Sequence, residues 1–573
     1  MNNYYTDNIN QQILLALLKS HGIKRIIASP GGTNPAMVIS FQHDDFFEMY
    51  SCVDERSAAY MACGLSEETG EPVAVCCTGA TASRNYMPAL TEAYYRKLPI
   101  LAITCSRPNY NLGHLMPQVT NRNVYPADVI TDGEHLQVVK DEKDFFDVEF
   151  KVNRALLALS HRGMGPVHIN VEVNSQSCTT RDLPKVNAIK RIVPANQFPQ
   201  MEYDKICIFI GSHKRFSNKE TELIEFFCET YNAVVLKDHT SGYYGKYAIH
   251  YSLIGTQIHE YNFHHFDLII HLGEISGDYL TFEQISADNV WRVSEDGILK
   301  IRFNHLNYVF EMPEEIFFQN YLKKEVPQES QLYNQLDTAY NQLYAKIPEL
   351  PLCHIYIAHK LSPLMPKNCV IHFAILNALR SWNFFSLDKS IRTNCNVGGF
   401  GIDGCTSTLI GASLADSSKL YFLFTGDLAF FYDLNSLGNR HIGSNIRILL
   451  LNDGKGAEFC HYMFPKYAED TNLYVAGAGH FGNQSRSLVK HYAEDLGFEY
   501  LQANCKEEFD SMCERFVSPQ ITKKPMLFEV ITSTANQSDS WKCLNNIQEQ
   551  TSQEIINDYV KHAKKRITKI FAK

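Results

Sequence analysis

Short apolar runs alternate with segments of helical periodicity along most of the chain. An amphipathic segment spans 9–21, and apolar runs lie at 23–28, 72–77, 100–104 and 165–171. Parallel strands that are buried on both faces read as nearly continuous apolar runs, and the helices that join them cover the sheet. The first third of the chain therefore predicts a parallel sheet with helices on both faces.

The same pattern returns twice further along the chain. A polar, proline-containing stretch at 181–199 precedes apolar runs at 205–211 and 266–273. Later apolar runs lie at 369–373, 420–424, 446–451 and 525–531. Because 573 residues are too many for one core, the chain must divide into domains. We predict an α/β protein of three domains, 1–185, 186–345 and 346–573, each a mostly parallel sheet flanked by helices.

The charge balance argues against nucleic acid as a partner. The chain has 53 Lys and Arg residues against 63 Asp and Glu residues, which gives a formal net charge of −10. A protein that binds nucleic acid presents a basic surface, and no motif of such proteins occurs in the sequence. We therefore expect no nucleic acid among the partners.

No segment predicts export or a membrane span. The apolar stretch 13–18 is far shorter than the 18 or so residues of a spanning helix and lacks a basic leader. The 16 cysteines are scattered through apolar runs, where reduced cysteine behaves as a small hydrophobe, and none has zinc spacing. We predict a cytoplasmic protein without a membrane span. The tail 548–573 predicts a basic amphipathic helix that packs on its own domain.

Glu55 stands at a position where chemistry is expected. It lies between the strand-like run 48–53 and a small-residue helix at 57–65, and parallel sheets bind ligands at the carboxyl ends of their strands. By itself, an acidic residue at a helix start is explained by the helix dipole. Motifs elsewhere in the chain change this interpretation.

Two later strand ends carry oxygen ligands. Gly426-Asp427 follows one apolar run, and Asn452-Asp453 follows the next, 25 residues after Asp427. Successive parallel strands end at one edge of a sheet, and Mg²⁺ prefers carboxylate and carbonyl oxygens. The two ends therefore predict a magnesium site.

Together, these motifs resemble the thiamine diphosphate (ThDP)-dependent 2-oxoacid decarboxylases and carboligases. The turn Thr78-Gly79-Ala80-Thr81 and the segment Ser106-Arg107-Pro108 match this superfamily in order and spacing. Over 1–120 the sequence is most similar to the menaquinone-pathway synthases, with acetolactate-synthase-like enzymes next. The resemblance implies the three-domain ThDP-enzyme fold, ThDP and Mg²⁺ as cofactors, and a homodimer or homotetramer.

The resemblance also implies roles for individual residues. Glu55, expected to be buried, would hydrogen-bond N1′ of the cofactor's pyrimidine and share a proton with it. Ile402 would wedge between the two cofactor rings, and a backbone carbonyl near Phe400 would accept from the 4′-amino group. His461 would shuttle a proton or contact the acceptor. Further implied residues are Thr78, Gly79, Thr81, Gln118, Gly426, Leu428 and Ala429 for the cofactor, Asp427, Asp453 and Lys455 for the metal, and Ser29, Gly31, Arg107 and Arg380 for the substrate.

Several positions depart from the menaquinone-synthase pattern. Thr33-Asn34 and Val397 stand where the family has arginines, Leu376 replaces a serine, and Asp453 replaces the usual second asparagine. Arginine forks are the natural partners of carboxylates, so a pocket with fewer of them favours a monocarboxylate donor. We predict decarboxylation of a pyruvate-like 2-oxoacid and transfer of the acyl unit to a carbonyl acceptor.

Three alternatives stay open. The first is a menaquinone-pathway synthase acting on 2-oxoglutarate and isochorismate. The second is a simple 2-oxoacid decarboxylase, but such enzymes often carry a His-His pair in the first domain, whereas His264-His265 falls in the central one. The third is a ThDP-binding paralogue without turnover, against which the presence of Glu55, Ile402 and Asp427 argues.

Overall fold

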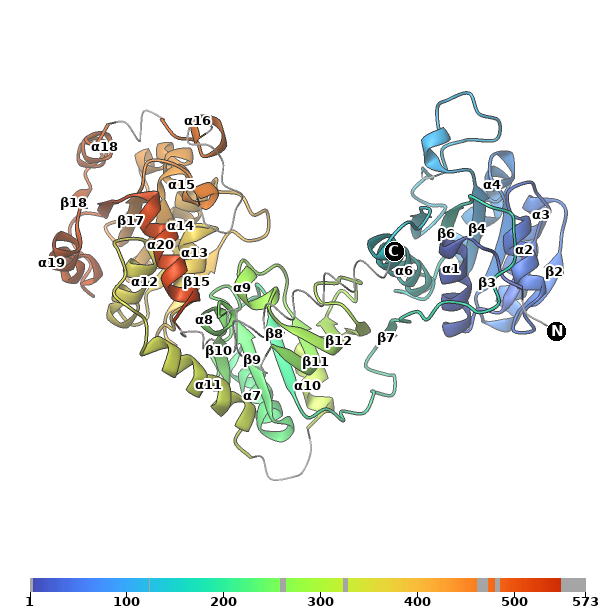
Figure 1. The fold of residues 1–573 in the computed structure, drawn as a ribbon, viewed down its shortest axis with the longest axis horizontal. Helices are drawn as coiled ribbons and strands as arrows, with labels where there is room; N and C mark the ends of the chain where they lie inside the picture. The colour runs from blue at the N-terminus through green and yellow to red at the C-terminus, as the bar shows by residue number, and fades with distance from the viewer. Residues whose placement is uncertain are drawn as a thin grey trace, which may run out of the picture. The chain divides into compact units, whose positions relative to one another are not determined.

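Three mostly parallel sheets with helices packed on them confirm the predicted α/β class (Figure 1). The computed structural model describes residues 4–122, 124–257, 264–322, 328–460, 472–479 and 485–547. By compactness, Met1–Ile192 and Leu306–Val309 form one unit, and Val193–His305 with the described residues from Phe310 onward form another. The boundaries predicted after residues 185 and 345 are not tested by this division and stay predictions.

The first sheet has the strand order β2-β1-β3-β4-β6-β5, and its neighbouring strands pair in parallel. Its strands are β1 (Arg25–Ala28), β2 (Glu48–Ser51), β3 (Val73–Thr78), β4 (Ile100–Ser106), β5 (Asp132–Leu136) and β6 (Val167–Glu172). The helices are α1 (Ile9–Ser20), α2 (Pro35–Gln42), α3 (Glu55–Thr69), α4 (Thr81–Asn85), α5 (Met87–Arg96) and α6 (Glu142–Ala158). All predicted strands of this sheet are present, and β5 is an additional one.

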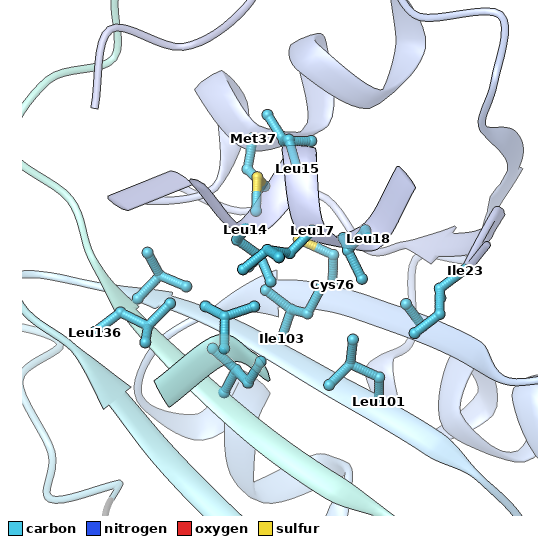
Figure 2. Packing of buried hydrophobic residues seen from close by; sticks show 14 of the residues in the cluster. Leu14, Leu15, Leu17, Leu18, Ile23, Met37, Cys76, Leu101, Ile103 and Leu136 are labelled. Carbon is cyan, nitrogen blue, oxygen red and sulfur yellow. The ribbon is translucent and has the colours of Figure 1, made fainter. Parts of the chain in front are cut away.

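Successive side chains of β3 enter two different cores, one on each face of the sheet. Cys76 belongs to a buried cluster with leucines of α1, and Figure 2 shows Leu14 and Leu17 beside Cys76 and Ile103. The neighbouring Cys77 belongs to a second cluster, with alanines of α3 and α5. Every cysteine whose side chain the structure describes is a free thiol. Burial on both faces explains why these strands read as unbroken apolar runs.

The central sheet contains the strand order β10-β9-β8-β11-β12, again with parallel pairs. These strands are β8 (Ile206–Ile210), β9 (Ala233–Lys237), β10 (Ala248–His250), β11 (His265–Leu272) and β12 (Ser286–Ser294); β7 (Lys190–Ile192) and β13 (Leu306–Glu311) are further strands. The helices are α7 (Asn218–Tyr231), α8 (Ser252–Gly255), α9 (Tyr279–Phe282), α10 (Glu314–Asn320) and α11 (Gln331–Tyr344). Chain order runs outward in opposite directions from β8 and β11, so the sheet has a topological switch point between them.

The third sheet has the order β15-β14-β16-β17-β19-β18. Its strands are β14 (Val370–Phe373), β15 (Arg392–Cys395), β16 (Tyr421–Gly426), β17 (Ile446–Asn452), β18 (Glu499–Ala503) and β19 (Met526–Ile531). The helices are α12 (His354–Leu361), α13 (Asn377–Trp382), α14 (Cys405–Ser413), α15 (Asp427–Tyr432), α16 (Asn472–Val475), α18 (Leu488–Asp495), α19 (Lys506–Val517) and α20 (Thr534–Asn545). When the strands of each sheet are numbered along the chain, the first and third sheets share one order, 2-1-3-4-6-5.

Two sequence predictions concern membranes and the chain end. Within the ranges that the structure describes, no helix has the length and apolar character needed to cross a membrane. The helix predicted at 548–573 lies outside the described residues.

Candidate active site

The turns that follow β1 and β3 are in direct contact. Ser29 is buried and its hydroxyl donates to the Cys52 carbonyl over 2.7 Å. The Thr33 and Thr78 hydroxyls lie 2.5 Å apart. A Cβ atom on Gly31 would lie 2.4 Å from the Thr78 Cβ atom, so only glycine lets the two turns approach this closely. The structure thus brings the predicted substrate turn against the predicted cofactor turn.

This close approach can be tested by adding a methyl group. Gly31→Ala should lower the free energy of unfolding by about 1–3 kcal/mol, the usual effect of overpacking, because Thr78 must move. It should also weaken ThDP binding. Gly32→Ala is the matched control, since its Cβ would meet nothing within 4 Å. Denaturant unfolding and ThDP titration measure both effects, and equal behaviour of the two variants would show that the contact is unimportant.

The turn between β3 and α4 has a strained backbone. Ala80 has φ +61° and ψ −130°, a conformation that L-residues rarely adopt and that costs about 1–3 kcal/mol. Thr81 begins α4 directly after it and is exposed. A Cβ on Gly79 would lie 3.0 Å from the Arg122 guanidinium, so the turn is also tightly packed. Such strain often accompanies ligand-binding turns.

Glu55 is the first residue of α3. The helix is capped by Asp54, whose side chain accepts from the Ser57 backbone N–H over 3.1 Å. The Asn85 amide donates to the Glu55 carboxylate over 3.1 Å, so α4 fixes its position. We expected a buried glutamate, but in this chain Glu55 is partly exposed. The reason is its place in the first turn, outside the face of α3 that packs on the sheet through Ala58 and Ala62.

Two other predicted residues of this unit, Arg107 and Gln118, make no described contact with these turns. Arg107 is exposed and makes no hydrogen bond or ion pair within the described ranges. Gln118 is also exposed and has a φ of +63°. Their roles stay predictions.

Arg122 is a residue that the sequence interpretation missed. It is only 3% exposed, and its Nε donates to the Asn170 side chain over 3.0 Å. Its Nη1 is buried without a hydrogen-bond partner, beside Gly79. Burial lowers the pKa of the guanidinium. The contact between Arg122 and Gly79 joins positions 43 residues apart. Arg122 lies in a loop without a recognised motif, so neither its spacing nor the local charge indicated this contact.

Two of the three predicted metal residues, Asp427 and Asp453, directly follow the carboxyl ends of β16 and β17. Asp427 is 3% exposed, and its carboxylate accepts from the Leu428 N–H over 2.7 Å and from the Gly454 N–H over 2.9 Å. Burial raises the pKa of Asp427 to about 6. Burial and the charge of Asp427 raise the pKa of Asp453 well above its ordinary value. A buried carboxylate whose charge acts on a partly buried one beside it forms an environment that a cation would stabilise.

These donors suit magnesium held together with a diphosphate. Mg²⁺ commonly binds one or two carboxylates, with phosphate oxygens and waters as its other ligands. No group of three His, Cys, Asp or Glu side chains in the described ranges is placed to hold a metal by itself. Asn452 donates its amide N–H to Glu529 over 2.8 Å, which holds the nitrogen end of the side chain. Lys455 follows in the same turn, where its backbone N–H bonds the Asp453 carboxylate.

The remaining predicted cofactor residues lie at the end of β16, at the start of α15 and in the loop between β15 and α14. Gly426 ends β16, and Leu428 and Ala429 form the first turn of α15. Ile402 is partly buried and packs against the core of the third sheet. Phe400 has a φ of +56°, which turns its backbone sharply. These positions fit the proposed loop around the cofactor, although the structure does not test the role of each residue.

Arg380 is already paired within the protein. Its Nη1 donates to Glu458 over 2.5 Å, and both side chains are mostly buried. Its guanidinium also lies 4.6 Å from the centre of the Tyr279 ring. Arg380 thus already has an acidic partner, while its Nε is buried without a hydrogen-bond partner. Its role toward the substrate stays a prediction. His461 lies outside the described residues.

Comparison with known proteins identifies the family. Residues 10–124 match the model described as thiamine pyrophosphate enzyme, N-terminal TPP binding domain. A 2-succinyl-5-enolpyruvyl-6-hydroxy-3-cyclohexene-1-carboxylate synthase of Phocaeicola vulgatus is 30% identical over 559 residues, covering 92% of this chain and 96% of the relative. The synthase of the same name from Bacteroides fragilis is 30% identical, with 92% and 97% coverage, and that of Flavobacterium psychrophilum 27%, with 91% and 96%. The chain belongs to this synthase family.

Membership of the synthase family makes the protein a ThDP-dependent enzyme with the fold of thiamine pyrophosphate enzymes. Mg²⁺ is the usual partner metal of ThDP, and the residues present fit both. The buried Asp427 and the partly buried Asp453 offer carboxylate oxygens of the kind that Mg²⁺ prefers. The turn at Gly31 has no room for a side chain beside Thr78, and the turn at Gly79 is tightly packed against Arg122. The resemblance found in the sequence is thus confirmed at the level of the family and its cofactor.

Proposed function

We propose that this enzyme has the activity for which its relatives are named, the synthesis of 2-succinyl-5-enolpyruvyl-6-hydroxy-3-cyclohexene-1-carboxylate. The observation that carries the proposal is the match of 92% of the chain to synthases of that name, at 30% identity. This assignment replaces the pyruvate-like donor that we predicted from the missing arginines. The substrates would be 2-oxoglutarate as the donor and isochorismate as the acceptor, as the resemblance to this family implies.

Each proposed role follows from a residue's position. Bound ThDP would supply a carbon nucleophile that adds to the 2-oxoacid and accepts the electrons left when CO₂ departs. Glu55, held by Asn85, would keep a proton at N1′ of the pyrimidine. Asp427 and Asp453 would hold the metal that neutralises the diphosphate.

The loop after β15 would shape the cofactor. Ile402, supported by the third core, would separate the two rings. The turned backbone at Phe400 would offer a carbonyl to the 4′-amino group. A homodimer or homotetramer remains part of the proposal, by resemblance to the family.

The second candidate is a carboligase that uses a pyruvate-like donor. Several arginines expected to bind the carboxylates of the anionic substrates are absent or already paired. Val397 is buried and apolar where the family has an arginine, and Thr33 bonds Thr78 instead of offering a positive charge. Arg380 is neutralised by Glu458. Burying a second donor carboxylate without a partner would cost several kcal/mol. If the protein has the synthase activity, other cationic side chains must therefore bind the substrate carboxylates.

A donor comparison separates the candidates. We expect CO₂ release from 2-oxoglutarate with isochorismate to exceed release from pyruvate by about 10²-fold or more, because a site built to pair a polar group rejects donors that lack it. Pyruvate and 2-oxobutyrate should be assayed with and without an added aldehyde. A preference for pyruvate with the aldehyde would establish the second candidate. Bound ThDP without CO₂ release from any of these donors would indicate a paralogue without turnover.

A further inference from the structure

The positive charge of Arg122 has no counter-ion within the part of the chain that the structure describes. The side chain is 3% exposed, and no described carboxylate forms an ion pair with it. Arginine stays protonated in proteins, so its charge is buried together with the side chain. Burial opposes that charge and lowers the pKa of the guanidinium. A buried charge without a partner is strongly unfavourable, so its presence calls for an explanation.

Two of the three guanidinium nitrogens of Arg122 are also unpaired. Its Nε donates to the side-chain oxygen of Asn170 over 3.0 Å. Its Nη1 is buried without a hydrogen-bond partner, and its Nη2 makes no hydrogen bond to any described residue. The two Nη atoms form the end of the fork through which arginine binds a carboxylate by two parallel hydrogen bonds. The end of the Arg122 fork is therefore available to such a group.

Glu172 is the carboxylate whose charge acts on Arg122, but it is bound to other donors. It accepts from the Asn109 backbone N–H over 2.6 Å, from His135 Nε2 over 3.0 Å and from the Val138 backbone N–H over 3.3 Å. These donors hold the Glu172 carboxylate away from an ion pair with Arg122. The charge of Arg122 is thus left for a group from outside the chain.

The surroundings of Arg122 hold it in place without neutralising it. The side-chain oxygen of Asn170 also accepts from the Thr104 hydroxyl over 2.9 Å, which fixes the acceptor of the Arg122 Nε. Arg84 of α4 donates to the backbone carbonyl of Asn121 over 2.5 Å, which fixes the preceding residue of the loop. A charge that is positioned in advance by neutral groups suits the binding of an anion.

Arg122 lies beside the turns that the sequence assigned to substrate and cofactor. Its Nη1 is 3.0 Å from the place where a Cβ atom on Gly79 would lie. The Gly79 N–H donates to the Thr33 hydroxyl over 3.4 Å, and that hydroxyl donates to the Cys105 carbonyl over 2.5 Å. Thr33 and Asn34 stand where the resemblance predicted an arginine. The distant loop therefore brings a positive charge next to the turn that lacks one.

We propose that Arg122 binds a carboxylate of an anionic substrate and so supplies the positive charge that the turn at Thr33 lacks. The identity of the substrate rests on the proposed function, whereas the affinity for a carboxylate follows from the unpaired fork. The carboxylate belongs either to the 2-oxoacid donor or to the ring-bearing acceptor. Arg122 is then a determinant of specificity for anionic substrates.

Thermal unfolding of the protein with ThDP and Mg²⁺, without substrate, separates this role from a structural one. Arg122→Gln keeps an amide N–H for Asn170 and removes the uncompensated charge, so the unfolding midpoint should stay equal or rise. Arg447→Gln is the contrast. Arg447 is fully buried and donates to the carbonyls of Phe516 and Gln520 over 2.6 Å each, so its loss should lower the midpoint. A similar fall in both variants would show that Arg122 is structural and overturn the proposal.

Calorimetric titration with two unreactive carboxylates tests the binding itself. Glutarate stands for the donor without its 2-oxo group, and 1-cyclohexenecarboxylate stands for the acceptor. Arg122→Gln should weaken the binding of at least one of them by about tenfold or more, as loss of a charged hydrogen bond does. Arg122→Lys keeps the charge without the fork and should weaken the same probe less. The probe that responds identifies the source of the carboxylate.

Arg96→Gln is the matched control for charge. Arg96 is an exposed arginine of α5 that pairs with Glu67, so this variant should bind both probes as the unchanged protein does. The proposal fails if neither probe binds the unchanged protein at millimolar concentration, if neither responds to Arg122→Gln, or if Arg96→Gln has the same effect.

Steady-state kinetics keep this inference separate from the proposed function. In an active synthase, Arg122→Gln should raise the Michaelis constant of the substrate whose probe responds by about tenfold or more, and unchanged constants would overturn the role of Arg122 alone. A protein that binds a probe through Arg122 but does not convert 2-oxoglutarate and isochorismate would contradict the proposed function and leave the carboxylate site intact.

Discussion

Replacing Glu55 by glutamine should leave ThDP bound and slow hydrogen exchange at C2 of the cofactor by about 10²–10⁴-fold. This is the usual contribution of a positioned acid or base. Glutamine keeps the size of the side chain and its contact with Asn85, but it cannot hold and release a proton at N1′. Exchange is followed by NMR after acid quenching in deuterated buffer.

Asp54→Asn is a suitable control for this experiment. Asp54 is the adjacent carboxylate and caps α3 through Ser57, and asparagine caps helices equally well. The variant changes the local charge by the same amount, so exchange should stay near the normal rate. If Glu55→Gln also exchanges normally, Glu55 is not the activating acid.

Replacing Asp427 by alanine should abolish Mg²⁺-dependent retention of ThDP. The diphosphate would then enter a dry site without its compensating ion, which is strongly unfavourable. Asp427→Ala also removes the acceptor for the Leu428 and Gly454 N–H groups. Asp427→Asn, which keeps an acceptor oxygen, is therefore needed beside it and should lose most of the metal dependence. Equilibrium dialysis of ThDP with Mg²⁺ or with EDTA measures the effect.

Asp416→Ala controls for the loss of one negative charge from the same domain. Asp416 is at the surface, where it accepts from Ser418 and pairs with Lys419, so ThDP retention should be unchanged. Equal ThDP affinity of the unchanged protein in Mg²⁺ and in EDTA would refute the metal assignment.

The strands could be predicted because a strand that is buried on both faces appears in the sequence as a continuous apolar run. In β3 and β4 both faces pack against helices, so every position is apolar or small, and the runs at 72–77 and 100–104 marked them correctly. The strand β5 was not predicted. It pairs only with β6 at the edge of the sheet, and its sequence Asp-Gly-Glu-His-Leu has no apolar run because several of its residues are only partly buried or exposed.

Site residues could be predicted only where they directly follow a strand. Asp427 and Asp453 come straight after β16 and β17, so the order of strands brings them together. The pairing of Arg380 with Glu458 joins residues 78 positions apart, and no local pattern encodes it. The partial exposure of Glu55 depends on how the first turn of α3 meets the sheet.

The shared strand order of the first and third sheets has a consequence for the history of this chain. One order, 2-1-3-4-6-5, occurs twice in one polypeptide, as duplication of an ancestral domain would produce. The third strand of each sheet is followed by different residues. Hydroxyl side chains and a glycine lie at the end of β3, and an acidic residue follows β16. Because the hydroxyls and the acidic residue follow strands of different sheets, neither sheet is expected to bind the whole cofactor by itself.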